Sequence, residues 1–184
     1  MKPVAAALVA VAILGALTGC GPTRPEGRLP ACDPEAMLAK VDLREADTGS
    51  GVVAVDLQII NRTDEWCMLD GYPTVSILDA VTNAPIGQGA VPMADRPGDI
   101  VDLPPGETAY ALIETTKAMP EFVGCEAHTA QGMSVILPGA QADRALVLPS
   151  PVAQFCNLPE LETLLVSGFS LQPLAGHDTR EADG

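Results

Sequence analysis

The sequence predicts an all-β protein. We expect an antiparallel β-sandwich of about seven short strands that is cross-linked by disulfides. Three observations support this fold class. Apolar residues alternate with polar ones in short segments, which is the period of a half-buried strand. Turn-forming residues are frequent, with 17 Pro and 17 Gly among 184 residues, and they separate the short segments. Five cysteines accompany an apolar N-terminal segment of the kind that directs secretion, so disulfides are expected.

The clearest expected strand covers residues 52–61. Its apolar residues Val53 and Val55 fall on one face, and its polar residues Asp56 and Gln58 fall on the other. Such alternation indicates one buried and one solvated face. Because aromatic residues form only 3% of the chain, the core must consist of Val, Leu, Ile and Ala. The other expected strands, in chain order, are 41–45, 74–78, 108–114, 133–139, 144–149 and 164–173.

Helical periodicity is scarce after the N-terminal segment. One short turn is expected near residues 33–39, where Asp33 can cap and Pro34 occupies the first helical position. A second short turn is expected near residues 158–164.

Residues 1–19 resemble a bacterial lipoprotein signal peptide. Lys2 precedes an apolar run over residues 3–17, which is shorter than the roughly 20 residues of a spanning helix. The run ends in LTGC at residues 17–20, which is similar to a lipobox. The resemblance implies cleavage before Cys20, a diacylglyceryl group on its thiol, and anchoring to the extracytoplasmic side of the cell membrane. The alternatives are an uncleaved anchor or an ordinary signal peptide cut elsewhere.

The rest of the chain divides into three parts. Residues 20–31 hold the lipidated Cys and a Pro- and Gly-rich stretch, which we expect to be a flexible tether. Residues 32–175 are expected to form the sandwich domain, and residues 176–184 a disordered acidic tail.

The charge balance limits the partners. The chain has 10 basic and 24 acidic residues, and removing residues 1–19 with their one Lys changes the net charge from −14 to −15. Nucleic acid is therefore not an expected partner. Anionic headgroups would repel this surface, so the lipid on Cys20 must hold the protein at the membrane. A protein or envelope component stays a possible partner, and the sequence does not indicate an oligomeric state.

Four cysteines remain if Cys20 is lipidated, and an even number in an oxidising compartment predicts two disulfides. Three pairings are possible. We favour Cys32–Cys67 and Cys125–Cys156, each of which would close a loop of about 30 residues. The sequence has no C-x-x-C motif or other ligand spacing for a metal, and no cofactor is expected.

No catalytic residue is expected. The chain has two His and no G-x-S-x-G motif, and His128 is expected to be an exposed loop residue. Asn61-Arg62-Thr63 matches a glycosylation sequon, which we interpret as chance. The scattered Met residues do not indicate a copper site. Two groups of acids are interpreted as solvated loop residues rather than calcium ligands: Asp64, Glu65 and Asp70, and Asp95, Asp99 and Asp102.

Trp66 and Tyr72 are the candidate binding residues. They flank Cys67 in the stretch EWCMLDGYP, which holds the only Trp of the chain. Large aromatic side chains near a loop can anchor a partner. Alternatively, they pack over the Cys67 disulfide and seal one end of the sandwich. Gly71, Tyr72 and Pro73 are expected to form the turn that starts the next strand.

The chain resembles a family of secreted and lipid-anchored domains of high-GC Gram-positive bacteria, domain of unknown function 4232. The resemblance covers about residues 32–172, and its most specific part is the C-x-L-x-G-Y-P block at residues 67–73. Later matches are LPPGETAYA, SVILPG and the last Cys. The resemblance implies an immunoglobulin-like sandwich and supplies no activity, cofactor or catalytic residue.

These observations together predict a lipid-anchored extracytoplasmic domain that is a non-catalytic binding module for a protein or envelope component. One alternative is a structural or accessory envelope domain without a ligand of its own. Another is an enzyme of an unrecognised type.

Overall fold

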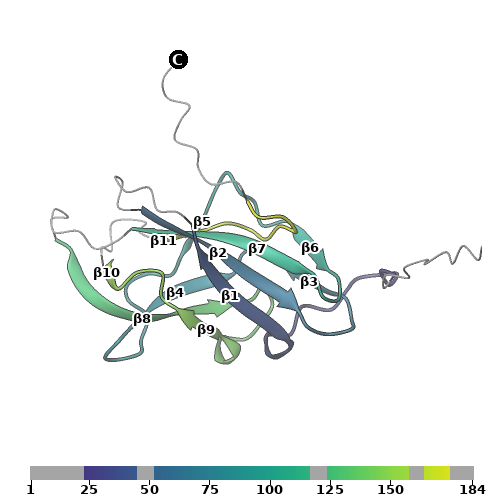
Figure 1. The fold of residues 1–184 in the computed structure, drawn as a ribbon, viewed down its shortest axis with the longest axis horizontal. Coiled ribbons are helices and arrows are strands. Elements are labelled where there is room, and N and C mark those ends of the chain that lie inside the picture. The colour runs from purple at the N-terminus through teal and green to yellow at the C-terminus, as the bar shows by residue number, and fades with distance from the viewer. Residues whose placement is uncertain (1–22, 45–51, 117–123, 158–163, 175–184) are drawn as a thin grey trace, which may run out of the picture.

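The computed structural model describes residues 23–44, 52–116, 124–157 and 164–174. These residues form an all-β sandwich, which confirms the predicted fold class (Figure 1). The strands are β1 (Met37–Leu43), β2 (Val52–Asn61), β3 (Cys67–Asp70), β4 (Thr74–Asp79), β5 (Val91–Pro92), β6 (Ile100–Leu103), β7 (Thr108–Thr116), β8 (Glu126–Ile136), β9 (Leu146–Pro149), β10 (Gln154–Asn157) and β11 (Leu164–Val166).

The larger sheet has the order β1-β2-β7-β11-β5. Its centre is the long antiparallel pair of β2 and β7, which runs from Val52 opposite Thr116 to Ile60 opposite Thr108. Strand β2 alternates between buried and partly exposed residues along its whole length, because one of its faces lies on the core. The pairing of β11 with β5 is parallel, so the sheet is not purely antiparallel.

The second sheet is built around β8, which pairs with β4 on one side and with β9 and β10 on the other. All of these pairings are antiparallel. Strand β8 spans the sandwich lengthwise: its beginning pairs with β10, and its end pairs with β9 and the start of β4. The β4–β8 register shifts at the end of β4: Leu78 lies opposite Gly132 and Asp79 opposite Ala130, so β8 has one extra residue, Gln131, at this point.

A third, two-stranded sheet of β3 and β6 lies at one end of the molecule (Figure 1). Cys67 lies opposite Leu103, and Asp70 lies opposite Ile100. The chain before Cys32 runs parallel to β3 along its other edge, where Ala31 forms an isolated bridge with Met68.

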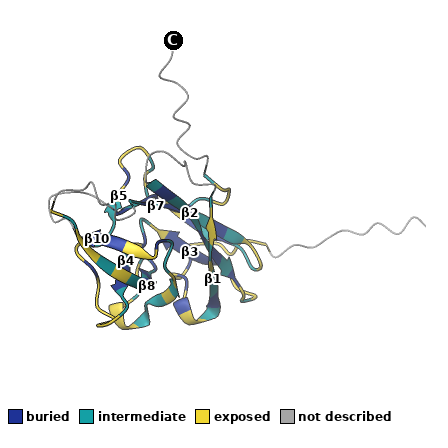
Figure 2. Ribbon diagram, turned by 60° about the vertical axis from the view of Figure 1, so that its left-hand side comes forward, coloured by how far each residue is buried: buried dark blue, intermediate teal, exposed yellow. Residues whose placement is uncertain are grey.

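The core lies between the sheets. Residues from both sheets belong to one buried cluster, including Leu57 of β2, Ile77 of β4 and Met133 of β8. The core is mainly aliphatic, as the composition predicts, and Phe155 is its largest fully buried side chain. Figure 2 shows the alternation of buried and exposed residues along the strands. In the part of the chain that the structure describes, there is no helix long and apolar enough to cross a membrane.

The predicted strands compare well with the observed ones in the middle of the chain. The bounds of β2 are those predicted, whereas β1 begins four residues earlier than expected and β8 seven residues earlier. Only a short 3₁₀ turn, Pro34–Ala36, forms where a helical turn was expected; Asp33 caps it by accepting a hydrogen bond from the Glu35 N–H. The turn expected near residues 158–164 falls almost wholly outside the described residues. Strands β3, β5, β6 and β10 were not predicted.

Candidate functional site

The structure contains both disulfides of the favoured pairing. Cys32 and Cys67 are joined with an S–S distance of 2.02 Å, and Cys125 and Cys156 with 2.00 Å. The first bond lies where β3 begins, at the end of the molecule that we call the strap end. The second joins the beginning of β8 to β10, at the end that we call the pocket end. Cys20 lies outside the described residues.

The two ends are far apart, because β8 runs between them. The pocket end lies beside Glu126, where β8 begins, and the strap end lies beyond Ile136, where it ends. A Cβ atom placed on Gly139 would lie only 3.4 Å from the Ala31 Cβ, so the segment after β8 contacts the segment that precedes β3. At about 3.4 Å per residue, β8 separates the ends by on the order of 30 Å.

Residues 23–31, which we call the N-terminal strap, lie on the sandwich at the strap end. The Met68 N–H donates to the Pro30 carbonyl over 2.8 Å, and the Cys32 N–H donates to the Met68 carbonyl over 3.0 Å. Leu29 is buried, which contributes about 1.5–3 kcal/mol for a Leu side chain. The expectation of a flexible tether up to residue 31 therefore differs from the structure, where the chain is already paired and buried before Cys32.

Two Arg–Asp ion pairs fasten the strap to the two-stranded sheet. Arg24 Nε lies 2.6 Å from Asp102 Oδ2 on β6, and Arg28 Nη2 lies 3.5 Å from Asp70 Oδ2 on β3. Asp70 and Asp102 were expected to be solvated loop acids; both are at least partly exposed, but they lie on strands and not in loops, which corrects the placement. Their side chains are 46% and 32% exposed, so each pair contributes at most about 1 kcal/mol.

The strap covers the side chain of Met68 on the outward face of β3. Its neighbours Cys67 and Leu69 belong to the core cluster, so Met68 faces away from the core. Met68 is nevertheless only 9% exposed. Since Asp70 shares this outward face and pairs with Arg28, we assign the burial of Met68 to the strap.

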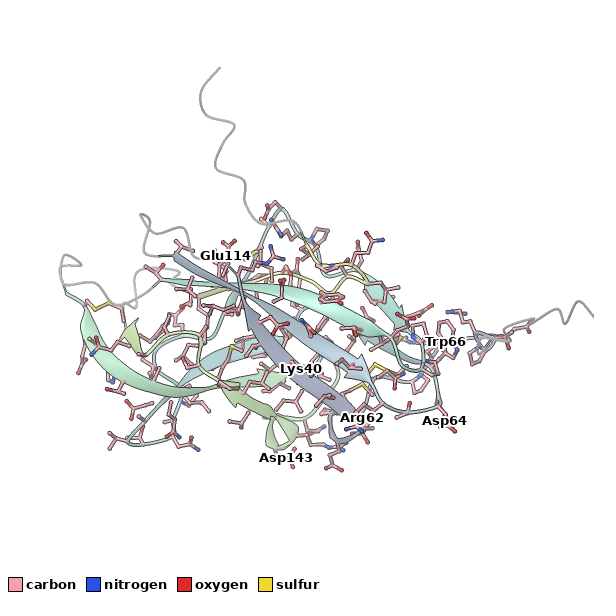
Figure 3. All side chains as sticks on the ribbon, viewed as in Figure 1. Lys40, Arg62, Asp64, Trp66, Glu114 and Asp143 are labelled. Atoms are coloured by element: carbon pink, nitrogen blue, oxygen red, sulfur yellow. A yellow bond between two sulfur atoms is a disulfide. The ribbon has the colours of Figure 1, made fainter. Side chains whose placement is uncertain are left out.

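The two aromatic candidates do not form one site. Trp66 precedes β3 and lies at the strap end (Figure 3). Tyr72 follows β3, at the other end of that strand. Tyr72 packs against Gly98: a Cβ on that glycine would lie 2.9 Å from the Tyr72 ring. Both side chains are partly buried. The Trp66 indole nitrogen is buried and has no acceptor among the described residues.

The turn that follows β3 is as predicted. Gly71 adopts a φ of 105°, in the left-handed region that favours glycine, and Pro73 is buried directly before β4.

Asn61 shapes the loop that leads to Trp66. Its amide nitrogen donates to the Glu65 carbonyl over 2.8 Å and to the Leu103 carbonyl over 3.1 Å. Its side-chain oxygen accepts from the Thr63 N–H over 3.0 Å. Asn61 is completely buried, so the sequon at this position is inaccessible in the folded domain. This agrees with its interpretation as a chance match.

The pocket end contains a hollow of about 170 Å³. Its wall combines one carboxylate and one imidazole with small and apolar residues: Asp79, Thr82, Pro85, Ile86, Gly87 and His128.

Asp79 organises the turn beside this pocket. Its Oδ1 accepts from the N–H groups of Thr82 and Val81, over 2.8 and 2.9 Å, and from the Thr82 hydroxyl over 3.0 Å. The Thr82 N–H, the Val81 N–H and the Thr82 hydroxyl, with a further contribution from His128, lower the pKa of Asp79 from 3.8 to about 2, against the opposing effect of burial. Asp79 is therefore a carboxylate at neutral pH.

His128 lies on β8 and not on an exposed loop, which corrects the expectation from the sequence. Its side chain is 31% exposed because β10 pairs along this part of β8, with Phe155 directly opposite. His128 Nδ1 lies 3.3 Å from Asp79 Oδ2. The Thr82 hydroxyl donates to Asp79 and accepts from the Ala84 N–H, so it serves the turn rather than pairing with the imidazole as a nucleophile.

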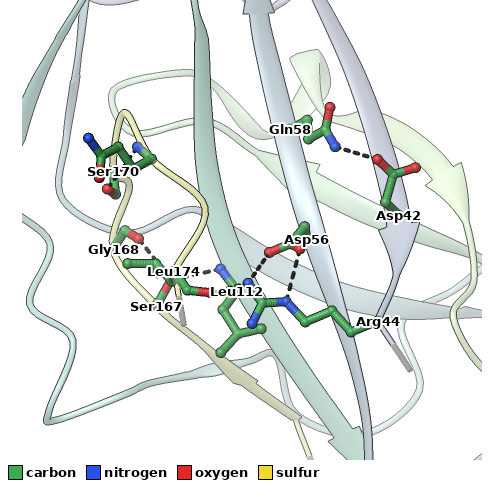
Figure 4. Close-up of polar contacts among 10 residues, drawn as sticks. Asp42, Arg44, Asp56, Gln58, Leu112, Ser167, Gly168, Ser170 and Leu174 are labelled. Carbon is green, nitrogen blue, oxygen red and sulfur yellow. Dashed lines mark hydrogen bonds and ion pairs between the residues drawn. The ribbon is translucent and has the colours of Figure 1, made fainter. Parts of the chain in front are cut away.

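A polar cluster on the outer face of the larger sheet holds the C-terminal segment (Figure 4). Arg44 makes two bonds to Asp56, of 2.9 and 2.5 Å, and donates to the Leu174 carbonyl. Ser170 exchanges two backbone hydrogen bonds with Tyr110 of β7, which extends the sheet beyond β11. This cluster is fully engaged in holding the chain, so we do not assign it a ligand.

Sequence reasoning missed the strap contacts and the Asp79–His128 pair. Arg24 and Asp102 are 78 residues apart, and His128 and Asp79 are 49 apart. Each pair joins two segments that are distant in sequence, and local sequence patterns do not predict such a contact. Within the described ranges, no three His, Cys, Asp or Glu side chains gather as they would to hold a metal ion.

No curated protein and no solved structure matches this chain. Residues 32–168 match the family described as Domain of unknown function (DUF4232). The match begins at Cys32, extends two residues beyond β11, and so includes all four bonded cysteines and every strand of the sandwich. It covers well over half of the chain, and the chain therefore belongs to the DUF4232 family.

Proposed function

We propose that this protein is a lipid-anchored extracytoplasmic domain that binds a protein or another envelope component without catalysing a reaction. The observation that carries the proposal is the use of the cysteines. The chain has five, and the two disulfides consume four of them. Cys20, at the end of the apolar N-terminal run, is the one left over, and its position suits lipidation. Disulfides are also typical of an oxidising compartment.

The polar groups of the pocket end support a binding role more than a catalytic one. Asp79 and Thr82 are committed to the turn that they form, and His128 contacts Asp79 without a nucleophile on its other side in the described residues. The exposed turn nearby presents Val81, which is 90% exposed. An exposed apolar residue beside a small pocket is a reasonable contact for a partner.

The anchor is tested with the variant Cys20→Ala. Wild-type protein is expected to remain with membranes after washing in high salt, and Cys20→Ala is expected to appear in the soluble fraction. A Cys125→Ser/Cys156→Ser variant is the matched control, since it also removes cysteine but should keep the anchor. Membrane retention of Cys20→Ala would refute lipidation at this residue.

The binding role is tested by crosslinking the anchored protein on intact cells and identifying its partners. Val81→Asp and His128→Ala are expected to lower the yield of a specific crosslink, while Val147→Asp on β9 should not. Val147 is also strongly exposed, at 69%, so it controls for a generic effect of surface charge. A crosslink pattern that none of these variants alters would contradict binding at the pocket end.

One observation favours an accessory structural role as the second candidate. Trp66 and Tyr72 are partly buried and lie at opposite ends of β3. This placement favours a role in packing of the sandwich over a binding surface that the two residues share. If Trp66→Ala and Tyr72→Ala lower thermal stability and leave every crosslink unchanged, these two residues have a structural role only.

A further inference from the structure

We infer that the strap end of the sandwich faces the bilayer, so that the pocket end points away from it. This inference deepens the proposed function and rests on the lipid anchor at Cys20. The strap end faces the surface of the membrane in which the protein's own acyl chains are inserted. The observations behind it are the docking of the strap, the length of chain between strap and lipid, and the opposite placement of the two ends.

The chain is held against the domain from Arg24 onward, four positions after Cys20. Arg24 is paired to Asp102, and Leu29 is buried. Only two residues, Gly21 and Pro22, separate Cys20 from Thr23, the first described residue, and the three Cα–Cα steps between them span at most about 11 Å even when fully extended. The lipid attachment point therefore lies within about 11 Å of Thr23.

A free tether would not restrict the orientation of the domain in this way. If residues 20–31 were unattached, 12 residues could span about 40 Å, which exceeds the length of β8. The domain could then present either end to the membrane. Because the strap is docked, the attachment point lies close to the strap end and about 30 Å from the pocket end.

The charge of the strap end does not draw it to the membrane. The strap end has exposed residues of both signs: Arg62 lies in the same loop as Asp64 and Glu65 (Figure 3). Arg24 and Arg28 are neutralised by aspartates. This end is thus not a basic patch, and anionic headgroups do not attract it. The orientation results from the short covalent connection, and it should persist at high salt.

Trp66 makes the orientation measurable, since it is the only Trp of the chain and lies at the strap end (Figure 3). The full-length lipidated protein is reconstituted into vesicles of phosphatidylglycerol and phosphatidylethanolamine that contain dansyl-labelled phosphatidylethanolamine. Energy transfer from Trp to dansyl is then recorded. The matched variant is Trp66→Phe/Val81→Trp, which moves the donor to an exposed turn at the pocket end. Circular dichroism verifies that both proteins are folded.

The wild-type protein is expected to transfer energy strongly to the labelled headgroups, at low and at high salt. The Val81→Trp donor is expected to lose most of this transfer. Equal or stronger transfer from Val81→Trp, or no transfer from either donor, would overturn the orientation.

One further variant and a flotation assay separate the failure of this inference from the failure of the lipid anchor. Insertion of 20 Gly and Ser residues between Pro22 and Thr23 should lower the transfer from Trp66, because the lipid is then no longer held near the strap end; unchanged transfer contradicts the inference. Wild-type protein that fails to float with the vesicles would overturn the lipid anchor and the orientation together. Floating protein with the stronger transfer at Val81→Trp overturns the orientation alone.

Discussion

At each end of the sandwich, the side chain of the last residue of a strand closes the following turn, but the residue type differs between the two ends. At the strap end, β2 ends at Asn61, whose side-chain oxygen accepts the N–H of the residue two positions later. At the pocket end, β4 ends at Asp79, whose side-chain oxygen does the same. Each side chain closes a turn of the Asx type. The two sites differ in burial, since Asn61 is completely buried and Asp79 is 14% exposed in its side chain.

The difference in burial explains why Asn61 stands at one end and Asp79 at the other. A charge at Asn61 would be costly to desolvate, and its amide also donates to two carbonyls, which a carboxylate cannot do. The Oδ1 of Asp79 accepts three hydrogen bonds and its Oδ2 contacts His128, which suits an ionised acid near water. The turn after β2 is therefore closed by a neutral side chain, and the turn after β4 by a charge that acid removes.

The disulfides give the largest expected effect. The two bonds span 35 and 31 residues, so loop closure alone predicts a similar loss of about 3–4 kcal/mol for each. Cys32 and Cys67 are both buried, whereas Cys125 is only partly buried. Cys32→Ser/Cys67→Ser should therefore lose about 1–3 kcal/mol more than Cys125→Ser/Cys156→Ser, because it buries one more hydroxyl. Urea unfolding of both variants measures the difference, and equal losses would show that loop closure alone sets the cost.

Asn61→Ala should have the next largest effect. It leaves the carbonyls of Glu65 and Leu103 without their donor in a buried site, which we expect to cost about 2–4 kcal/mol in unfolding free energy. Gln131→Ala is the control at the other end, because among the described residues this exposed amide donates a single hydrogen bond, to Asn83, and its loss should change stability by less than about 0.5 kcal/mol. Similar values for both variants would mean that the Asn61 contacts do not support the strap end.

Acid should weaken the turn that Asp79 closes at the pocket end. The pKa of Asp79 is lowered from 3.8 to about 2, so its contribution to stability is complete above pH 3.8 and is lost as the pH falls through about 2. Asp79→Asn keeps an acceptor oxygen but has no such dependence. The difference in unfolding free energy between wild type and Asp79→Asn should shrink as the pH falls from 3.8 towards 2. A difference that stays constant over this range would indicate that ionisation of Asp79 is irrelevant to the turn.

The strap ion pair should have the smallest effect on stability. Arg24 and Asp102 are 47% and 32% exposed, so Arg24→Ala is expected to cost about 0.2–1 kcal/mol and to cost less at high salt. Arg44→Ala is the comparison, because Arg44 and Asp56 are only 18% and 17% exposed and share two hydrogen bonds. Its loss should be larger and less sensitive to salt. A strong, salt-independent effect of Arg24→Ala would mean that the strap is more deeply embedded than these exposures indicate.

Much of the fold could be predicted from local pattern. The alternation in β2 shows its bounds and its buried face, because a strand with one solvated face has a period of two residues. Strands β3 and β6 were missed because each has only four residues, too few for periodicity to be distinctive. The beginning of β8 was missed because it is partly exposed and polar, and it forms a strand through its pairing with β10.

The candidate site was less predictable than the fold. Trp66 and Tyr72 were singled out by scarcity and by their closeness in sequence, yet β3 separates them. His128 was dismissed because the adjacent sequence offers it no partner, and its partner Asp79 comes from another strand.

The sequence by itself determined the all-β class, the number of cysteines available for disulfides, and the apolar run before Cys20, since these depend on composition and on short-range order. Only the tertiary structure decided that the strap lies on β3 and β6, that Asp70 and Asp102 hold its arginines, and that Asp79 meets His128 at the opposite end. Contacts of this kind join segments tens of residues apart, and the packing of the sheets, rather than any local preference, brings them within bonding distance.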